Sequence, residues 1–212
     1  MASHPSRTRG FTLIEMLVVI AILSLLAMFL IPSLSMGRQK GEIAETEARM
    51  TFLRTAIDRF ERVSQTYPPD DFTTLDPKVS WKRDDINTGI ESLILHLHVK
   101  RGGQSTLEDK QQWLSNTDQD HNTVESPVLG TNEKYEVVDA WGTPIAYFAA
   151  QYGGYAKEQS IQRTDGTIVK VGALTDTKGK PLHPTKYQLI SAGPDQEFGT
   201  EDDVSYPELA TR

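Results

Sequence analysis

Residues 11–31 read FTLIEMLVVIAILSLLAMFLI, and this stretch decides how the chain is organised. Only Thr12, Glu15 and Ser24 interrupt its apolar character. A helix rises about 1.5 Å per residue, so this run reaches roughly 31 Å, which matches a hydrocarbon core of about 30 Å. The run therefore predicts a transmembrane helix near the amino terminus.

The flank before this run predicts its orientation. Residues 1–10, MASHPSRTRG, contain Arg7 and Arg9 and no acidic residue. Positive charge on a short flank keeps that end in the cytoplasm, so the bulk of the chain is expected across the membrane. A cleavable secretory signal is disfavoured, because the apolar run exceeds the usual core of about 7–15 residues and no A-x-A-like site follows it. A plain uncleaved anchor stays open, although it does not explain Glu15.

The whole composition excludes several classes of function. The chain has 212 residues, 22 Lys and Arg against 29 Asp and Glu, a formal net charge of -7 and no cysteine. The acidic balance argues against nucleic acid as the main partner, because phosphate binding needs a basic surface. Without cysteine, disulfides, thiolate metal sites and cysteine nucleophiles are excluded. No G-x-S-x-G, H-E-x-x-H, P-loop or G-x-G-x-x-G motif occurs, so we expect no enzyme.

Glu15 is the most informative residue of the apolar run. A carboxylate in such a helix costs on the order of 2.5–3.5 kcal/mol at the centre of a membrane and less near its end, so it usually has a partner. No residue of the run is basic. The partner of Glu15 is therefore expected on another chain or at a freed amino terminus.

The string RGFTLIE, residues 9–15, resembles the processing site of the type IV pilin and type II secretion pseudopilin superfamily. The resemblance implies cleavage after Gly10 by a prepilin peptidase and N-methylation of Phe11. It also implies that Glu15 meets the amino terminus of a neighbouring subunit during assembly. Pro32 stands where many members carry a helix-loosening proline. The implied fold is pilin-like α+β: a long amino-terminal helix packed on a small antiparallel β-sheet, with an acidic loop near the carboxyl end.

Apolar residues keep helical spacing beyond Pro32, while charged residues occupy the other faces. The apolar stripe comprises Ile43, Met50, Leu53, Ile57, Phe60 and Val63. This pattern predicts an amphipathic helix that packs on its own domain and ends before Pro68 and Pro69.

The domain organisation follows from these features. We expect a cleaved leader over 1–10, a transmembrane and assembly helix over 11–32, the amphipathic half of that helix over 33–66, and an extracytoplasmic globular domain over 67–212. Within that domain, 70–134 is interpreted as a variable loop region around the short apolar segment GIESLILHLHVK, and 135–212 as a β-sheet and an acidic loop. Strands are predicted in KYEVVDAWGTPIAYFAA, in a hairpin around Asp165-Gly166, and in KYQLISAG.

The stretch SAGPDQEFGTEDDV, residues 191–204, concentrates acidic side chains. Calcium prefers oxygen ligands from carboxylates and backbone carbonyls, so this stretch is a candidate calcium-binding loop. The alternative is an acidic surface loop that water solvates. The succession of DAWGTPIAY, S-x-G-x-D and two later acids is similar to the major pseudopilins, in which this loop holds a structural calcium. The resemblance implies Ca²⁺ bound by Asp195, Asp202 and Asp203, with backbone carbonyls such as that of Ala192.

Two further polar groups carry weaker signals. Asp118, Asp120 and Asn122 match the opening of an EF-hand loop, but positions six and twelve lack the required glycine and glutamate. His96 and His98 would share one face of a strand, yet no third ligand is evident. We expect neither group to bind a metal.

The resemblance implies a structural role. The expected function is that of a type II secretion pseudopilus subunit, a homopolymer that works with minor pseudopilins and the inner-membrane secretion platform. The expected location is the inner membrane, single-pass, with a cytoplasmic amino terminus and a periplasmic globular domain, and then the assembled pseudopilus. The alternatives are a type IV pilus subunit for adhesion, motility or DNA uptake, and a membrane-anchored extracytoplasmic binding module or enzyme that never polymerises.

Overall fold

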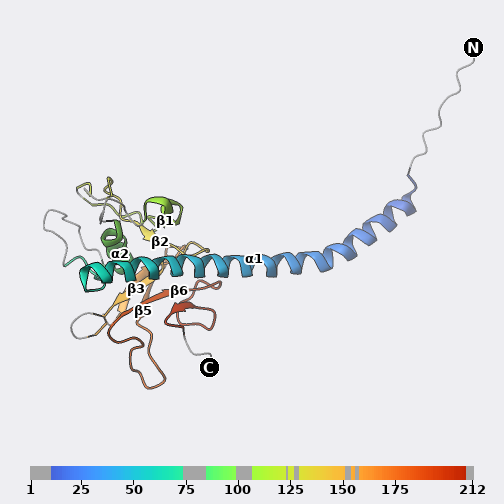
Figure 1. Ribbon diagram of the computed structural model, residues 1–212. Coiled ribbons are helices and arrows are strands. Elements are labelled where there is room, and N and C mark those ends of the chain that lie inside the picture. Colours follow the sequence, from blue (N-terminus) through green and yellow to red (C-terminus); the bar gives the residue numbers. More distant parts are fainter. Residues whose placement is uncertain are drawn as a thin grey trace, which may run out of the picture. The chain divides into compact units, whose positions relative to one another are not determined.

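The computed structural model describes residues 11–73, 85–98, 107–122, 124–126, 129–150, 154–155 and 158–208. The chain forms two compact units, Met1–Gly41 and Glu42–Arg212. Helix α1, Leu13–Ser64, belongs in part to each unit (Figure 1). Among the described residues, no helix is both long enough and apolar enough to cross a membrane. The transmembrane span expected over 11–32 therefore stays a prediction.

The carboxyl-terminal half of α1 contributes a buried stripe to the second unit. The buried members of the predicted stripe are Met50, Leu53, Ile57 and Phe60. The prediction is wrong for Val63, whose side chain is 67% exposed. Val63 lies at the edge of the stripe in the last turn of α1, which ends at Ser64.

Helix α2, Thr88–His98, includes residues 89–98 of the short apolar segment GIESLILHLHVK. Its apolar residues pack against α1 in the main core and comprise Ile90, Leu93, Ile94 and Leu97. A Cβ at Gly89 would overlap the backbone carbonyl of Tyr147 and the side chain of Gln159, so only glycine permits this close approach. His96 and His98 lie in the last turn of α2 and not on a strand, and residues two apart on a helix do not share a face.

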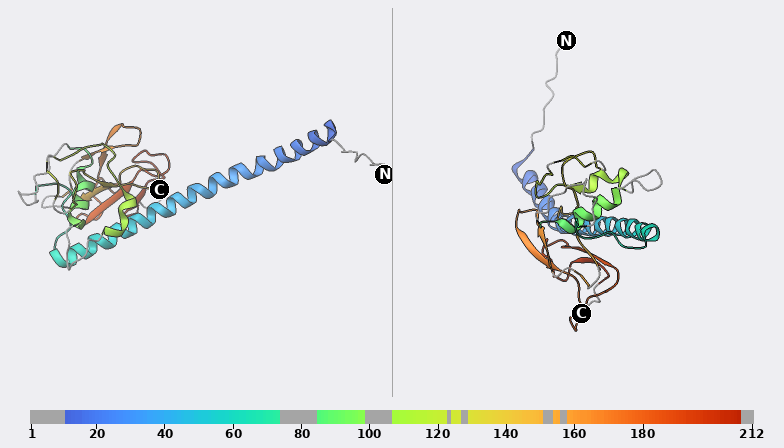
Figure 2. Two further views of the ribbon diagram at one scale, coloured as in Figure 1. Left: turned by 90° about the horizontal axis from the view of Figure 1, so that it is seen from above. Right: turned by 90° about the vertical axis from the view of Figure 1, so that its left-hand side faces the viewer.

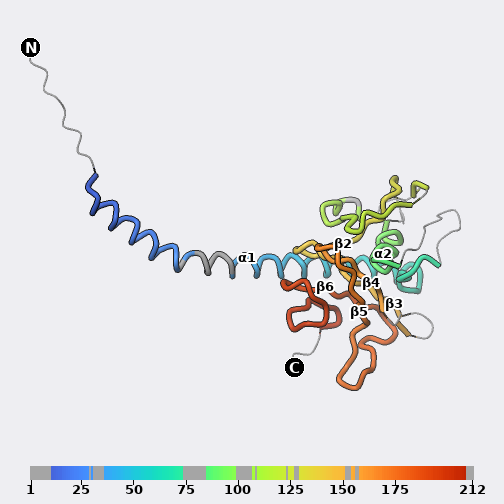
Figure 3. Tube along the Cα trace, turned by 180° about the vertical axis from the view of Figure 1, so that it is seen from behind, coloured from blue at the N-terminus to red at the C-terminus, as the bar shows by residue number. Residues whose placement is uncertain are grey.

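The described strands are short and pair with one another antiparallel, while Ser160 forms an isolated parallel bridge with Ile86. The 3₁₀-helix η1, Glu108–Trp113, precedes β1, Leu114–Ser115, which pairs with β2, Glu136–Val137. A second sheet has the order β3-β6-β7, formed by Ala146–Ala149, Tyr187–Ser191 and Val204–Tyr206. The third consists of β4, Glu158–Gln162, and β5, Ile168–Gly172, which confirms the hairpin predicted around Asp165-Gly166. Figures 2 and 3 show these elements from further directions.

Strands β3 and β6 of the sheet β3-β6-β7 are buried on both faces, whereas β7 is partly exposed. Alternate residues of a strand point to opposite faces. Tyr147 and Leu189, which are register partners, belong to the core cluster that includes the stripe of α1 and the apolar face of α2. Phe148 and Ile190 belong to a second cluster, with Ile161 of β4 and other residues of the β4-β5 hairpin. The fold is thus α+β, with helices and antiparallel strands around a shared core, as expected for a pilin-like protein.

Candidate functional site

The amino end of α1 is capped by the side chains of Thr12 and Glu15. The Oε2 atom of Glu15 accepts hydrogen bonds from the amide of Thr12 at 2.8 Å and from its hydroxyl at 2.7 Å. The amide of Glu15 donates in return to the Thr12 hydroxyl at 3.3 Å. These reciprocal contacts form a capping box, whose T-x-x-E signature stands in the sequence at 12–15 but was not part of the sequence-based expectations.

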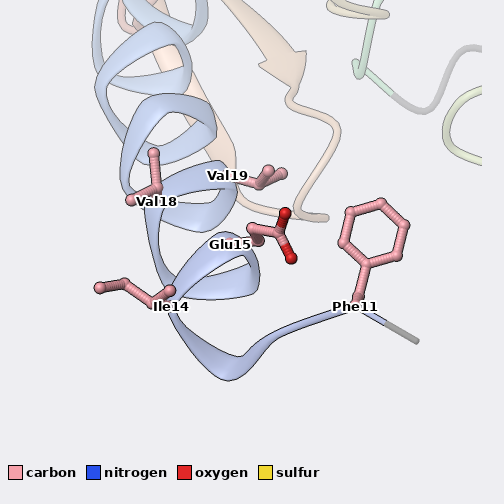
Figure 4. A pocket seen from close by; sticks show the side chains of 5 residues that line it. All are labelled: Phe11, Ile14, Glu15, Val18 and Val19. Carbon is pink, nitrogen blue, oxygen red and sulfur yellow. The ribbon is translucent and has the colours of Figure 1, made fainter. Parts of the chain in front are cut away.

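Glu15 lies in an apolar setting. Its carboxylate adjoins a hollow lined by Phe11, Ile14, Val18 and Val19, and Figure 4 shows it on the same side of the helix as the Phe11 ring. All five residues are exposed in the single chain. Gly10, the other half of the predicted cleavage site, lies outside the described residues. The roles predicted for Gly10, Phe11 and Glu15 remain predictions.

The DAWGT turn, residues 139–143, is bonded to α1. The indole nitrogen of Trp141 donates to the Glu42 carboxylate at 3.0 Å. The amide of Ala140 donates to the hydroxyl of Thr46, one helical turn further on, at 3.1 Å. These two hydrogen bonds attach the turn to the helix.

Arg49 makes the next contact along α1. Its Nη1 atom donates to the carbonyl oxygens of Val138 at 2.6 Å and Asp139 at 3.0 Å, and Nη2 forms an ion pair with Glu45. Arg49 is buried, so its cationic donors work in a poorly solvated setting where such bonds are strong. Arg49 is one of the charged residues outside the apolar stripe of the helix, and its bonds to Val138 and Asp139 were not predicted from the sequence.

Asp139 joins the turn to the start of the acidic loop. Its Oδ1 atom accepts the amides of Trp141 at 3.0 Å and Thr143 at 2.9 Å, and Oδ2 accepts the Ser191 hydroxyl at 2.7 Å. The Ser191 oxygen accepts the amide of Gly193 at 3.2 Å. Burial raises the pKa of Asp139, and the bonds from Ser191 and the two amides partly offset that effect. Asp139 therefore fixes the entry to the acidic loop.

The two ends of the acidic loop meet at Gly193. This residue has a φ of +67°, and a Cβ there would overlap the backbone carbonyl of Asp202. Glycine tolerates both the left-handed conformation and the close approach. The preceding residue, Ala192, directly follows β6 and is fully buried.

The carboxylates of the loop accept hydrogen bonds from the loop itself. The Asp195 amide donates to Asp202 at 3.2 Å, the Thr200 hydroxyl donates to Asp202 at 2.6 Å, and the Gly199 amide donates to Asp203 at 2.8 Å. Burial raises the pKa of Asp203, as do the charges of Asp202 and Asp195, against the lowering effect of the bonds from Gly199 and Thr200. The loop thus gathers negative charge at its closed end.

The predicted calcium ligands remain a prediction. Among the residues with described positions, one group of three acidic or histidine side chains has ligand atoms that all lie within 4.8 Å of one another, and it is not Asp195, Asp202 and Asp203. That group consists of Glu91, Asp118 and Asp120. Asp118 and Asp120 were not expected to bind a metal, because their loop lacks the glycine and the glutamate of an EF-hand at positions six and twelve. Glu91, the one acidic residue of α2, was not expected to join them.

Comparisons with known proteins agree on one family. The family model described as the prokaryotic N-terminal methylation motif matches residues 5–31. Type II secretion system core protein G of Escherichia coli (strain K12) is 27% identical over 201 residues, which cover 94% of this chain and 90% of that protein. Proteins of the same name from Pectobacterium carotovorum and Klebsiella pneumoniae are each 36% identical over 62 residues.

The extent of these matches differs. The 62-residue alignments cover 29% of this chain and 40% and 44% of the Pectobacterium and Klebsiella proteins, so the chain spans less than half of their length. The Escherichia coli alignment extends over both units of this chain. No solved structure shows a significant match to the chain. The shared name of these relatives does not favour the alternative of a type IV pilus subunit.

Proposed function

This chain belongs to the type IV pilin superfamily as a relative of the type II secretion major pseudopilins, and on this premise we propose that it polymerises into a periplasmic pseudopilus that drives protein export. One observation carries the proposal: the methylation motif at residues 5–31 and the similarity to a core protein G over 201 residues occur in the same chain. Repetition of one head-to-tail contact between identical subunits generates an open filament. The family consists of structural subunits, and we propose no catalytic role.

Processing would prepare the amino terminus for assembly. We propose that a prepilin peptidase cleaves after Gly10, that Phe11 is N-methylated, and that Glu15 then meets the Phe11 amine of a neighbouring subunit. Both capping bonds from Thr12 go to Oε2 of Glu15, so Oε1 is not engaged by Thr12. Glu15 can therefore cap its own helix and still offer an oxygen to a neighbour.

The apolar surface of the first unit supports a membrane-anchored origin. Leu13, Ile14 and Leu25 are 83%, 70% and 61% exposed in the single chain. Contiguous exposed apolar surface marks contact with a partner or a membrane. We propose that lipid of the inner membrane covers residues 11–32 before assembly and that neighbouring copies of the helix cover them in the filament. The minor pseudopilins and the inner-membrane platform are the further partners that this proposal implies.

We also propose a structural Ca²⁺ in the acidic loop, held by Asp195, Asp202, Asp203 and the carbonyl of Ala192. The close approach of Gly193 to the Asp202 carbonyl brings the two ends of the loop together, and the donor set is the all-oxygen type that calcium prefers. An ion there would replace the loop's own donors on Asp202 and Asp203. Its contribution would be to stabilise the loop by binding only the folded state.

The filament proposal is tested by Glu15→Ala, with Glu47→Ala as a matched control on an exposed position of the same helix. Each variant replaces the wild-type subunit in a strain with the complete secretion system. We expect Glu15→Ala to be cleaved after Gly10, as shown by mass spectrometry, but to lose pseudopilus crosslinks and protein export. Glu47→Ala keeps all three. Normal assembly and export by Glu15→Ala would contradict the proposal.

The calcium proposal is tested by thermal unfolding of the full chain in detergent micelles, in millimolar calcium and then in chelator. Ligand at about 100 times its dissociation constant adds roughly 2.7 kcal/mol, which raises the midpoint by about 5 °C or more at this size. We expect Asp195→Asn to reduce this rise. An unchanged rise in Asp195→Asn would remove that residue from the ligand set.

A further inference from the structure

The second acidic cluster brings together two segments far apart in the sequence. Glu91 lies in the first turn of α2, whereas Asp118 and Asp120 follow β1. α2 is in contact with β2, the pairing partner of β1, and Figures 1 and 3 show α2 beside β2. Asn116 shapes the acidic segment, since its Oδ1 accepts the Asp120 amide at 3.0 Å and its Nδ2 donates to the Asp120 carbonyl at 2.9 Å.

Glu91 is unusually poor in partners for a buried charge. Its side chain is fully buried, and neither carboxylate oxygen accepts a hydrogen bond from the residues with described positions. The ammonium of Lys134 lies 3.7 Å from Oε2, which is beyond hydrogen-bond distance. A buried carboxylate without donors loses its hydration and gains nothing in return. Glu91 therefore faces the other carboxylates of the cluster with Lys134 as its ion-pair partner and without a hydrogen bond to its oxygens from any described residue.

The cluster also carries more negative than positive charge. Lys134 is buried and forms ion pairs with Asp120 and Glu91. Glu136 of β2 is buried beside them, and its charge acts on Glu91. With Asp118 included, the part of the chain that the structure describes supplies four carboxylates and one ammonium to this cluster. Like charges in a poorly solvated interior repel one another strongly.

Neutral donors relieve only part of this charge. Asn87 Nδ2 lies 3.3 Å from the Asp118 carboxylate and 3.3 Å from Oε1 of Glu136, and the Thr117 amide donates to Oε2 of Glu136 at 2.9 Å. These donors hold the Asp118 and Glu136 side of the cluster. Among the described residues, none donates an equivalent hydrogen bond to Glu91. A bound cation or a proton would neutralise this side of the cluster, between α2 and the segment after β1.

We propose that Glu91, Asp118 and Asp120 bind a hard divalent cation, for which Ca²⁺ is the best match. Their carboxylate oxygens lie within 4.8 Å of one another and supply the anionic oxygen ligands that calcium takes. The site differs from an EF-hand loop, since its third carboxylate comes from α2 and not from a glutamate later in the same loop. The cation ties the first turn of α2 to the segment after β1, on elements other than the acidic loop.

Burial raises the pKa of Glu91 well above its usual range; the charge of Lys134 lowers it, and those of Asp120, Glu136 and Asp118 raise it. Protons therefore compete with the cation, and protonation alone is the alternative way to relieve the cluster. Lys134 competes as well, since it occupies Asp120. Replacement of Lys134 removes one of these competitors, so its effect on cation binding can be measured.

The test is calorimetric titration of CaCl₂, and separately MgCl₂, into the full chain in detergent micelles at pH 7.5. All proteins carry Asp195→Asn and Asp202→Asn, so the acidic loop contributes no binding. We expect one Ca²⁺ per chain in this background. Asp118→Asn and Asp120→Asn should each weaken the affinity at least about tenfold, because charge count sets calcium affinity. Asp109→Asn, at an exposed acidic position in η1, should leave the affinity unchanged.

Lys134→Met separates the cation site from a purely internal ion pair. Removal of the ammonium leaves the carboxylates to the metal, so we expect tighter Ca²⁺ binding and a larger calcium-induced rise in the unfolding midpoint. Absence of calcium heat in a background protein with folded circular dichroism would overturn the proposal. Binding that Asp118→Asn leaves unchanged, or a loss of stability in Lys134→Met that calcium does not restore, would overturn it too.

Discussion

Asp139→Ala should be among the most damaging single changes outside the apolar core. The aspartate is 1% exposed and accepts three hydrogen bonds, from the amides of Trp141 and Thr143 and from the hydroxyl of Ser191. Alanine provides no acceptor, so all three donors lose their partner. The turn at 139–143 and the entry to the acidic loop are both expected to loosen.

The magnitude follows from these donors. A buried donor left unsatisfied costs about 1–3 kcal/mol. The Thr143 amide and the Ser191 hydroxyl belong to fully buried residues, whereas Trp141 is half-buried and water can reach part of it. We therefore expect Asp139→Ala to lower the free energy of unfolding by about 3–6 kcal/mol. That is a large part of the roughly 5–15 kcal/mol typical of a domain.

The assay is urea denaturation of the full chain in detergent micelles, followed by tryptophan fluorescence. Asp139→Asn keeps an oxygen for the two amides and can donate to Ser191, so it should cost less than Asp139→Ala. Asp109→Ala, at an exposed position, should cost less than about 0.5 kcal/mol. A double-mutant cycle with Ser191→Ala should show coupling of at least about 0.5 kcal/mol. A loss below about 1 kcal/mol in Asp139→Ala would refute this reasoning.

Three other predictions rest on burial, titration and backbone geometry. Leu53→Ala should lower the free energy of unfolding by about 2–5 kcal/mol in the same denaturation assay, whereas Val63→Ala should have almost no effect, since Val63 is 67% exposed. Burial raises the pKa of Glu136 from 4.5, its value in the unfolded chain, to about 8, although the hydrogen bond from the Thr117 amide lowers it. The folded state then retains a proton that the unfolded state has lost, so stability in chelator should fall as pH rises from about 4.5 to 8, and pH-independent unfolding would contradict this. Gly193→Ala should cost at least about 1 kcal/mol, because φ is +67° and the new methyl group meets the Asp202 carbonyl; an unchanged unfolding midpoint would show that the loop can move aside.

Local patterns in the sequence were sufficient for much of the fold. The stripe from Met50 to Phe60 repeats at helical spacing, and neighbouring residues along the chain decide that spacing. Asp165-Gly166 marked the β4-β5 hairpin because a tight turn depends on a few adjacent residues. Strands β1 and β7 were not predicted, since segments of two and three residues are too short to show a period.

Contacts between distant segments were beyond the reach of such patterns. Arg49 and Asp139 are 90 residues apart, and nothing local distinguishes Arg49 from the solvated arginines of the same helix. Glu91 joins Asp118 and Asp120 only because α2 packs beside β2. Burial of these charges is likewise a property of the folded chain.

The sequence by itself determined the amino-terminal motif, the helical stripe and the α+β class, because each depends on residues close together along the chain. Only the tertiary structure decided which charges are buried and which of them meet. It attached the DAWGT turn to α1 through Arg49, Thr46 and Glu42. It also brought Glu91 of α2 together with Asp118 and Asp120. The physical reason is that desolvation and pairing of a charge depend on all the segments packed around it, wherever they lie in the chain.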